Sequence, residues 1–320
     1  MNNTGLIYGY YFNETDNATI INSEDVIDLT RSSWLHFDYS FEETKRWLNE
    51  HSQLDPVVIN ALLSEETRPR ATIVNEGLLI SLRGVNLAPN SNPEDMVSIR
   101  IWLEKSRIVS SRRRLLLSVS DIVSDLNQGA GPKSPAQLFV QLTERLMFRM
   151  ADTINDLEDK VLAIEENILA NNSFTLRSEL ADLRRQVIAL RRYLSPQREA
   201  MQQLQSEKIN LFSNDDKIRL REVTDQLIRF VEDLDSIRDR ATVTQEEVSN
   251  RLNEQMNNRM YVLSIVAAIF LPLGFLTGLL GINVGGIPGA DNTSAFSLFI
   301  IFLVIVVAIQ VWLFKKNKWF

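Results

Sequence analysis

Residues 261–289 read YVLSIVAAIFLPLGFLTGLLGINVGGIPG and contain no charged residue. After a short loop, a second uncharged segment, residues 295–314, reads AFSLFIIFLVIVVAIQVWLF. Each segment has about the 20 residues that an α-helix needs to cross roughly 30 Å of hydrocarbon. Buried helices of soluble proteins rarely run this long without a charge. We therefore predict two transmembrane helices, at residues 260–281 and 295–314.

The charges around these spans predict how the chain lies in a membrane. No N-terminal signal peptide is expected, because Met1–Ile20 has neither a basic start nor a long apolar run. The loop at residues 282–294 carries no Lys or Arg, whereas basic residues flank both spans on the opposite side. The positive-inside rule then places both termini in the cytoplasm, with residues 315–320 as a basic cytoplasmic tail. The flanking basic residues are Arg251, Arg259, Lys315, Lys316 and Lys318.

Composition limits the chemistry that the chain can support. Its 320 residues suggest two domains, and its formal net charge is −7. The negative charge argues against nucleic acid as a partner and is compatible with attraction of cations. There is no Cys, and only His36 and His51 are histidines, so a four-ligand Cys/His zinc site cannot form within one chain. Any metal ion is expected to be held by oxygen atoms or to stay hydrated, with no permanently bound cofactor.

Residues 1–132 have the pattern of a cytoplasmic domain of mixed α/β structure, in which short segments rich in Ile, Val and aromatic residues alternate with Asn, Pro and Gly. Asp55–Ser64 and Ser118–Leu126 are predicted to be helical, and Gly129–Pro132 marks the domain boundary. The basic run Arg112–Arg114 is interpreted as the solvated end of a strand, with anion binding as the alternative. The predicted strands are Leu6–Tyr11, Trp34–Asp38, Ala71–Asn75, Leu78–Arg83, Val97–Leu103 and Ile108–Arg112.

Residues 133–259 are predicted to form a helical stalk. Apolar residues recur at steps of three and four along three successive runs, which indicates helices that each have one apolar face. Pro196 and the stretch Asn210–Asp215 are expected to interrupt the pattern, and the short connections make neighbouring helices antiparallel. The third run, from about Asp215 to about Gly281, is predicted to be one helix of about 100 Å. Such a helix needs partner helices from its own chain and from other copies.

Two spans cannot enclose a pore, so transport through this protein would require a homo-oligomer. The first span is the better candidate for the pore wall, because small, apolar and polar residues repeat at steps of three and four along it. This pore stripe would suit an apolar constriction that gates by dewetting, and it would equally suit ordinary helix packing. Pro272 is expected to bend the span and to free a backbone carbonyl. The stripe consists of Asn257, Met260, Ser264, Ala267, Leu271, Gly274 and Gly278.

Asn283 comes where the first span is expected to end. A ring of Asn carboxamides and backbone carbonyls at a pore mouth would offer neutral oxygen atoms, which can hold a divalent ion through its hydration shell. The simpler interpretation of Asn283 by itself is a helix C-cap.

The third stalk helix, before the first span, carries an acidic face. This face is interpreted either as a solvated, salt-bridged surface or as a cation-attracting funnel. The candidate funnel acids are Glu222, Asp225, Glu232, Asp235, Asp239, Glu246 and Glu247.

Gly281-Ile282-Asn283, followed by Ile287-Pro288-Gly289 and a second span with a basic tail, resembles the CorA superfamily of divalent-cation transporters. The magnesium branch carries Gly-Met-Asn at this point, and the chain is similar to the zinc-transport (ZntB) branch, whose middle residue is Ile or Val. Other stretches that carry the resemblance, which covers nearly the whole chain, are Trp34–Tyr39, Arg68–Arg70, Asp121–Leu126 and Arg191–Arg198.

The resemblance implies an α+β protein of the bacterial inner membrane that assembles as a funnel-shaped homopentamer. An N-terminal α/β domain, a long helical coiled-coil funnel and two C-terminal transmembrane helices would make up each copy. Gly281, Ile282 and Asn283 would form the filter for a hydrated cation. Many magnesium-type members have Met-Pro-Glu in the outer loop, and this chain has Ile287-Pro288-Gly289. Asp291 is then the candidate acid at the outer mouth, or simply a turn residue.

These observations favour a non-enzymatic transporter of Zn²⁺, with proton coupling left open. The alternative within the same class is uptake of Mg²⁺, Co²⁺ or Ni²⁺. A membrane-anchored coiled-coil scaffold or sensor is the alternative from another class, and it would not need Asn283. An enzyme is disfavoured, because no P-loop and no HExxH motif occurs. The expected partners are other copies of the chain, the lipid bilayer and divalent cations.

Overall fold

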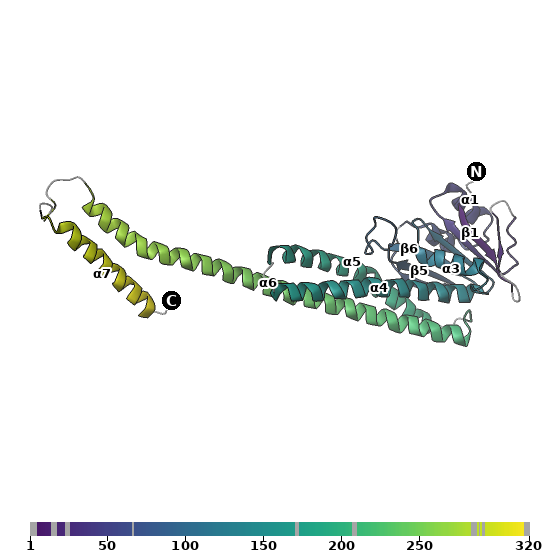
Figure 1. The fold of residues 1–320 in the computed structure, drawn as a ribbon. Helices are drawn as coiled ribbons and strands as arrows, with labels where there is room; N and C mark the ends of the chain where they lie inside the picture. The colour runs from purple at the N-terminus through teal and green to yellow at the C-terminus, as the bar shows by residue number, and fades with distance from the viewer. Residues whose placement is uncertain are drawn as a thin grey trace. The chain divides into compact units, whose positions relative to one another are not determined.

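A computed structural model describes residues 5–13, 18–22, 26–65, 67–169, 173–206, 210–282, 287, 289 and 292–316. The chain forms two compact units, residues 1–246 and 247–320. The first unit contains a sheet, its covering helices and most of the stalk (Figure 1). The long helix α6, Asn214–Leu280, contributes to both units.

The first unit is built on a mixed seven-stranded sheet with the order β2-β1-β3-β7-β6-β5-β4. Only β3 and β7 pair in parallel, and all other neighbours are antiparallel. The six predicted strands are confirmed, and the two-residue strand β2 was too short for the sequence pattern to reveal. The strands are β1 (Leu6–Tyr11), β2 (Thr19–Ile20), β3 (Ser33–Asp38), β4 (Arg70–Val74), β5 (Gly77–Gly84), β6 (Val97–Leu103) and β7 (Arg107–Arg112).

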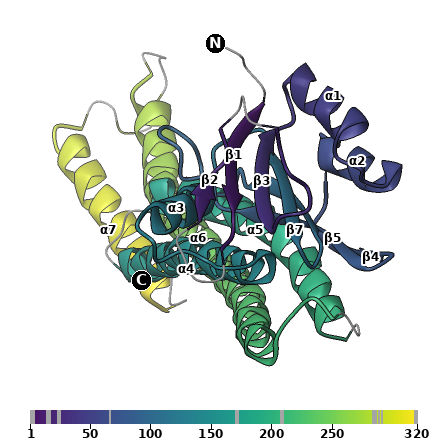
Figure 2. The ribbon, with the colours of Figure 1, turned by 90° about the vertical axis from the view of Figure 1, so that its right-hand side faces the viewer.

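Helices cover both faces of this sheet (Figure 2). On one face, α1 (Glu42–Glu50) and α2 (Pro56–Leu63) pack over alternate residues of β3 and β7, where Leu35, Phe37 and Val109 are buried. The helix α2 begins as expected, since the Asp55 carboxylate accepts a hydrogen bond from the backbone N–H of Val57. The sequence pattern did not reveal α1, because most of its residues are polar and only Thr44 and Leu48 are buried.

The opposite face of the sheet carries a buried polar network around His36. The Trp34 indole Nε1 donates to Ser110 Oγ at 2.9 Å, and Ser110 Oγ lies 2.7 Å from His36 Nδ1. Arg112 Nε donates to His36 Nε2 at 3.0 Å, which leaves the ring proton of neutral His36 on Nδ1. Burial, followed by the positive charge of Arg112, holds the pKa of His36 well below its usual value. Arg112 is therefore buried, and the interpretation of that residue as part of a solvated strand end is wrong.

This network makes folding stability depend on pH. Because the pKa of His36 is lower in the folded chain than the ordinary value of about 6.5, the unfolded chain binds the proton first, and stability falls as pH decreases below about 6.5. One such group contributes a slope of at most about 1.4 kcal/mol per pH unit. We expect His36→Gln to remove this contribution from urea-unfolding free energies measured between pH 5 and pH 7.5 in detergent. His51→Gln, at an exposed position, is the control, and parallel curves for His36→Gln and the wild type would contradict the prediction.

Side-chain pairs between the stalk helices establish their directions. Glu144 pairs with Arg219 and Glu165 with Arg240, both at 2.6 Å, so α4 (Pro135–Leu169) and α6 advance in the same direction. The intervening helix α5 (Ser173–Ser206) runs antiparallel to α6, since Arg184 contacts Gln245 and Gln205 contacts Leu220. The antiparallel arrangement expected from the short connections is thus confirmed for α5 and α6.

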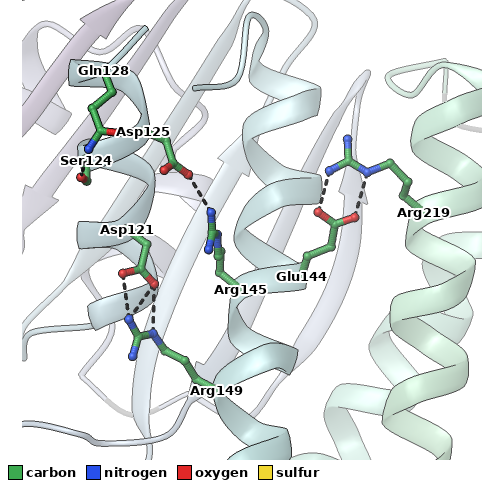
Figure 3. A network of polar contacts seen from close by, with 8 residues as sticks. All are labelled: Asp121, Ser124, Asp125, Gln128, Glu144, Arg145, Arg149 and Arg219. Atoms are coloured by element: carbon green, nitrogen blue, oxygen red, sulfur yellow. Dashed lines mark hydrogen bonds and ion pairs between the residues drawn. The ribbon is translucent and has the colours of Figure 1, made fainter. Parts of the chain in front are cut away.

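The same kind of pairing joins the stalk to the domain with the sheet. Figure 3 shows Asp121 and Asp125 of α3 (Leu117–Asn127) paired with Arg149 and Arg145 of α4. The Asp121–Arg149 pair is bidentate, with oxygen–nitrogen distances of 2.8–3.0 Å. Figure 3 also shows the ion pair between Glu144 of α4 and Arg219 of α6. These ion pairs lie outside the apolar faces of the helices. They fix the register of α4 against α3 and α6.

The expected interruption at Pro196 is wrong. Pro196 lies inside α5, which continues to Ser206. A proline within a helix costs about 3 kcal/mol, but the residues on both sides are anchored in the core. Leu194 and Ala200 are buried, and the Gln197 side chain accepts a hydrogen bond from the backbone N–H of Arg83 at 2.7 Å. Tertiary packing therefore holds this stretch helical.

The second unit contains the two uncharged segments. The C-terminal part of α6 and the helix α7 (Ala295–Lys316) are each long and apolar enough to cross a membrane, with mean hydropathies of 2.3 and 2.8. The most apolar 18 residues of each helix are not buried within the chain, which distinguishes both segments from core helices of a soluble protein. Large apolar side chains such as Leu271, Phe296 and Val304 are more than 60 % exposed and need either lipid or other chains to cover them.

Candidate functional site

The C-terminal end of α6 is closed at the first residue of the predicted filter. The backbone N–H of Gly281 donates to the Thr277 carbonyl oxygen at 2.9 Å, directly after the last helical residue, Leu280. A Cβ on Gly281 would lie 2.7 Å from that same oxygen, closer than side chains are found to approach. Residue 281 must therefore be glycine for the helix to end in this way. Ile282, the next residue, is half exposed.

The two other residues that the sequence assigned to the ion path outside the helix, Asn283 and Asp291, lie outside the described residues. Their roles as filter and outer-mouth acid stay predictions. Gly289, in the loop between the two spans, has a φ of 85°. A residue with a side chain would be strained there, so glycine suits this turn.

All seven residues of the pore stripe, from Asn257 to Gly278, are exposed in the single chain. Added Cβ atoms on Gly274 and Gly278 would meet nothing within 4 Å, so these glycines do not serve close packing inside one chain. The hydroxyl of Ser264 donates to the Met260 carbonyl at 2.8 Å, which leaves its oxygen as an acceptor along the stripe. The stripe therefore combines several small residues with neutral acceptor groups on a face that the described part of its own chain leaves exposed.

Pro272 interrupts the hydrogen bonds of α6 within the span. It has no N–H, so the carbonyl four residues earlier, that of Ala268, lacks its helical donor. The structure supplies a replacement, since the Gln310 amide of α7 donates to the Ala268 oxygen at 3.4 Å. The bond is long, but it joins Gln310, the one polar residue between Leu298 and Val311, to the carbonyl that Pro272 releases. The sequence predicted the freed carbonyl and did not reveal its partner.

The predicted funnel acids divide into two groups. Asp235 pairs with Arg191 at 2.6 Å, Asp239 with Arg238, and Glu247 with Arg251, as the salt-bridged interpretation requires. The other four, Glu222, Asp225, Glu232 and Glu246, are exposed and form no ion pair within the described part of the chain. The acidic face is thus partly used to hold helices together, and four acids stay available to attract cations.

Asp233, on the same acidic face of α6, is a crowded carboxylate. Burial, followed by the nearby charges of Glu158 and Glu232, raises the pKa of Asp233. Glu158 comes from α4, so the sequence alone did not show that it lies near α6. Among the described residues, no group of three or more His, Asp or Glu side chains is arranged to hold a metal ion. The attraction of cations by this acidic face stays a prediction.

The comparison with known families accounts for this architecture. The model of the CorA-like Mg²⁺ transporter proteins matches residues 30–316, which include β3 to β7 of the sheet, the stalk and both spans. The chain belongs to the CorA-like family. This assignment confirms the resemblance carried by Gly281-Ile282-Asn283 and agrees with the long helix and two C-terminal spans.

Individual relatives match this chain over nearly its full length. The zinc transport protein ZntB of Pectobacterium carotovorum is 37% identical over 319 residues, which cover 100% of this chain and 97% of the relative. The divalent cation transporter CmaX of Pseudomonas aeruginosa is 40% identical, covering 98% of this chain and 97% of the relative. The structure of the full-length CmaX protein matches with a TM-score of 0.86 at 39% identity, covering 100% of this chain and 99% of that one.

Proposed function

We propose that this protein transports divalent metal cations across a membrane, with Zn²⁺ as the principal ion, through a homo-oligomeric pore lined by α6. The observation that carries the proposal is the pore stripe, which is uncharged, exposed along its whole length and leads to Gly281-Ile282-Asn283. Two spans in one chain cannot surround an ion path, so several copies must present this face to one another. The zinc and divalent-cation transport of its relatives supports the choice of cargo.

The ion is proposed to pass with much of its hydration shell in place. The chain has no Cys and only two His, of which His36 is buried in the sheet domain. Tight chelation of Zn²⁺ normally uses such ligands. The carboxamide of Asn283 and the carbonyl oxygens around Gly281 would instead accept hydrogen bonds from metal-bound water. A neutral filter of this kind binds weakly enough to release the ion.

The assembly is proposed to be a homopentamer in a bacterial inner membrane, with both termini in the cytoplasm. Residues 260–281 and 295–314 would span the bilayer, and residues 1–132 and 133–259 would form the cytoplasmic domain and funnel. Lys315 and Lys316 in the last turn of α7 support this orientation. The described parts of the two spans contain no Asp, Glu or His, so a proton pathway would have to use the loop, the funnel or water.

Flux into liposomes tests the proposal. Purified protein is reconstituted with a zinc-sensitive dye inside, and Zn²⁺ entry is measured against protein-free liposomes, with Mg²⁺ as competitor. We expect Zn²⁺ entry that a moderate excess of Mg²⁺ does not abolish. Acceleration by an imposed pH gradient would establish proton coupling. Uptake of Mg²⁺ in preference to Zn²⁺ would overturn the choice of ion, and oligomers that carry no divalent ion would overturn the proposal itself.

A further inference from the structure

A pocket opens at one end of the sheet in the first unit, remote in sequence from the spans. The strands β3, β5 and β7 end there, and β6 begins there, because β3 is parallel to β7 while β6 is antiparallel to both β5 and β7. The pocket has a volume of about 420 Å³. It is lined by Tyr39, Glu65, Arg83, Val97, Ser98, Arg113 and Arg114.

The lining is strongly basic. Three arginines, Arg83, Arg113 and Arg114, and one glutamate, Glu65, are among the described residues that line the pocket. Arg83 Nη1 and Arg114 Nη2 both donate to the Met96 carbonyl oxygen, at 2.9 and 3.0 Å, so one backbone oxygen holds two cationic side chains together. Arg113 is exposed, and among the described residues no carboxylate lies within ion-pairing distance of Arg113 or Arg114. An anion in the pocket would therefore meet the positive charges of Arg113 and Arg114, which no carboxylate of the described residues pairs with.

A fourth arginine lies behind the pocket wall. Arg100 on β6 is fully buried, stacks 4.5 Å above the ring of Tyr39 and donates through Nη2 to the Glu65 carbonyl at 2.9 Å. Its Nε and Nη1 atoms have no hydrogen-bond partner among the described residues. A buried guanidinium without a carboxylate is costly unless an opposite charge lies nearby. The two residues that it contacts both line the pocket, so Arg100 adds positive charge to the same site.

We propose that this pocket binds a phosphate group through Arg83, Arg113 and Arg114. The planar guanidinium group matches phosphate oxygens in a bidentate manner, and several arginines together favour a multiply charged group. Ser98, opposite Arg83 in the β5–β6 register, adds a hydroxyl donor. The volume is several times that of one phosphate, which fits pyrophosphate or a phosphate ester of moderate size.

The site is connected to the stalk within the first unit. The guanidinium of Arg83 lies 3.9 Å from the ring centre of Tyr193 on α5, and its backbone N–H donates to Gln197 of the same helix. A ligand that shifts the Arg83 side chain would therefore affect its contacts with α5, the helix that packs against α6. This inference does not depend on transport, because it concerns binding at the sheet domain alone.

Isothermal titration calorimetry on the full chain in detergent tests the proposal. Pyrophosphate, inorganic phosphate and a short-chain phosphatidic acid are titrated in parallel at constant ionic strength, without divalent ions, so that a soluble ligand and a lipid headgroup are distinguished. We expect Arg113→Gln to weaken binding of the best of these probes by at least about tenfold. Arg113 makes no hydrogen bond within the described chain, so the unfolding temperature should stay unchanged. Arg46→Gln on α1, an exposed position outside the pocket, is the matched control and should bind as the wild type does.

A second variant should move affinity in the opposite direction. Glu65→Gln removes the carboxylate that lies among the described lining residues and is expected to tighten binding by about two- to fivefold. A merely structural effect of substitution would not strengthen binding. No binding of any probe at millimolar concentration, or equal loss in Arg113→Gln and Arg46→Gln, would overturn the proposal.

Discussion

Replacement of Asn283 by alanine is expected to lower Zn²⁺ flux by about 10- to 100-fold. A hydrogen bond to a charged group contributes about 1.5–3 kcal/mol, and each 1.4 kcal/mol corresponds to a tenfold change. In the sequence, Asn283 comes two residues after Gly281, which completes the last hydrogen bond of α6. Flux into dye-loaded liposomes provides the measurement, at equal amounts of reconstituted oligomer.

Two control variants separate the filter from simpler roles of Asn283. Asn258→Ala removes an exposed carboxamide of α6 next to the pore stripe and should leave flux unchanged. Asn283→Gly keeps a residue that suits a helix C-cap but lacks the carboxamide. If Asn283→Gly transports at the wild-type rate, Asn283 is a capping residue and its assignment to the filter is wrong. Loss of flux in both Asn283 variants supports the filter.

The sequence could predict the parts of this protein that depend on local patterns. The alternating apolar residues of β6 and the uncharged run of α7 each identify their element without reference to the rest of the chain. The two-residue strand β2 and the polar helix α1 have no such pattern, because they are held by contacts with β1 and α2. The predicted interruption at Pro196 was wrong for the same reason, because buried residues on both sides of the proline hold α5 helical.

The candidate site follows the same division. Spacing along one helix was enough to place the seven stripe residues on an exposed face of α6, and their role in a pore stays a prediction. Pairings between distant segments were not predictable: Asp235 with Arg191, Ala268 with Gln310, and Arg112 with His36 each join residues more than 40 positions apart. The sequence shows that these residues are polar, and only the fold shows which of them are occupied with each other.

The bond between Gln310 and Ala268 is expected to be needed only because residue 272 is proline. Gln310→Leu removes the donor and leaves the Ala268 carbonyl without a partner in the apolar region of the span, where unsatisfied backbone groups are costly. Measured hydrogen bonds between membrane helices average about 0.6 kcal/mol and reach about 1.7 kcal/mol. We therefore expect Gln310→Leu to destabilise the protein by about 0.6–1.7 kcal/mol in unfolding experiments in mixed micelles.

Pro272→Ala restores a backbone N–H that can bond to Ala268 within α6, so the double variant Pro272→Ala/Gln310→Leu should recover the stability that Gln310→Leu loses. The double-mutant cycle measures this dependence directly, because two residues that act on one carbonyl give non-additive effects. Zn²⁺ flux of the same variants shows whether the bend at Pro272 is itself needed for transport. Additive effects of the two substitutions would mean that Gln310 does not compensate for the proline, and the 3.4 Å contact would then be incidental.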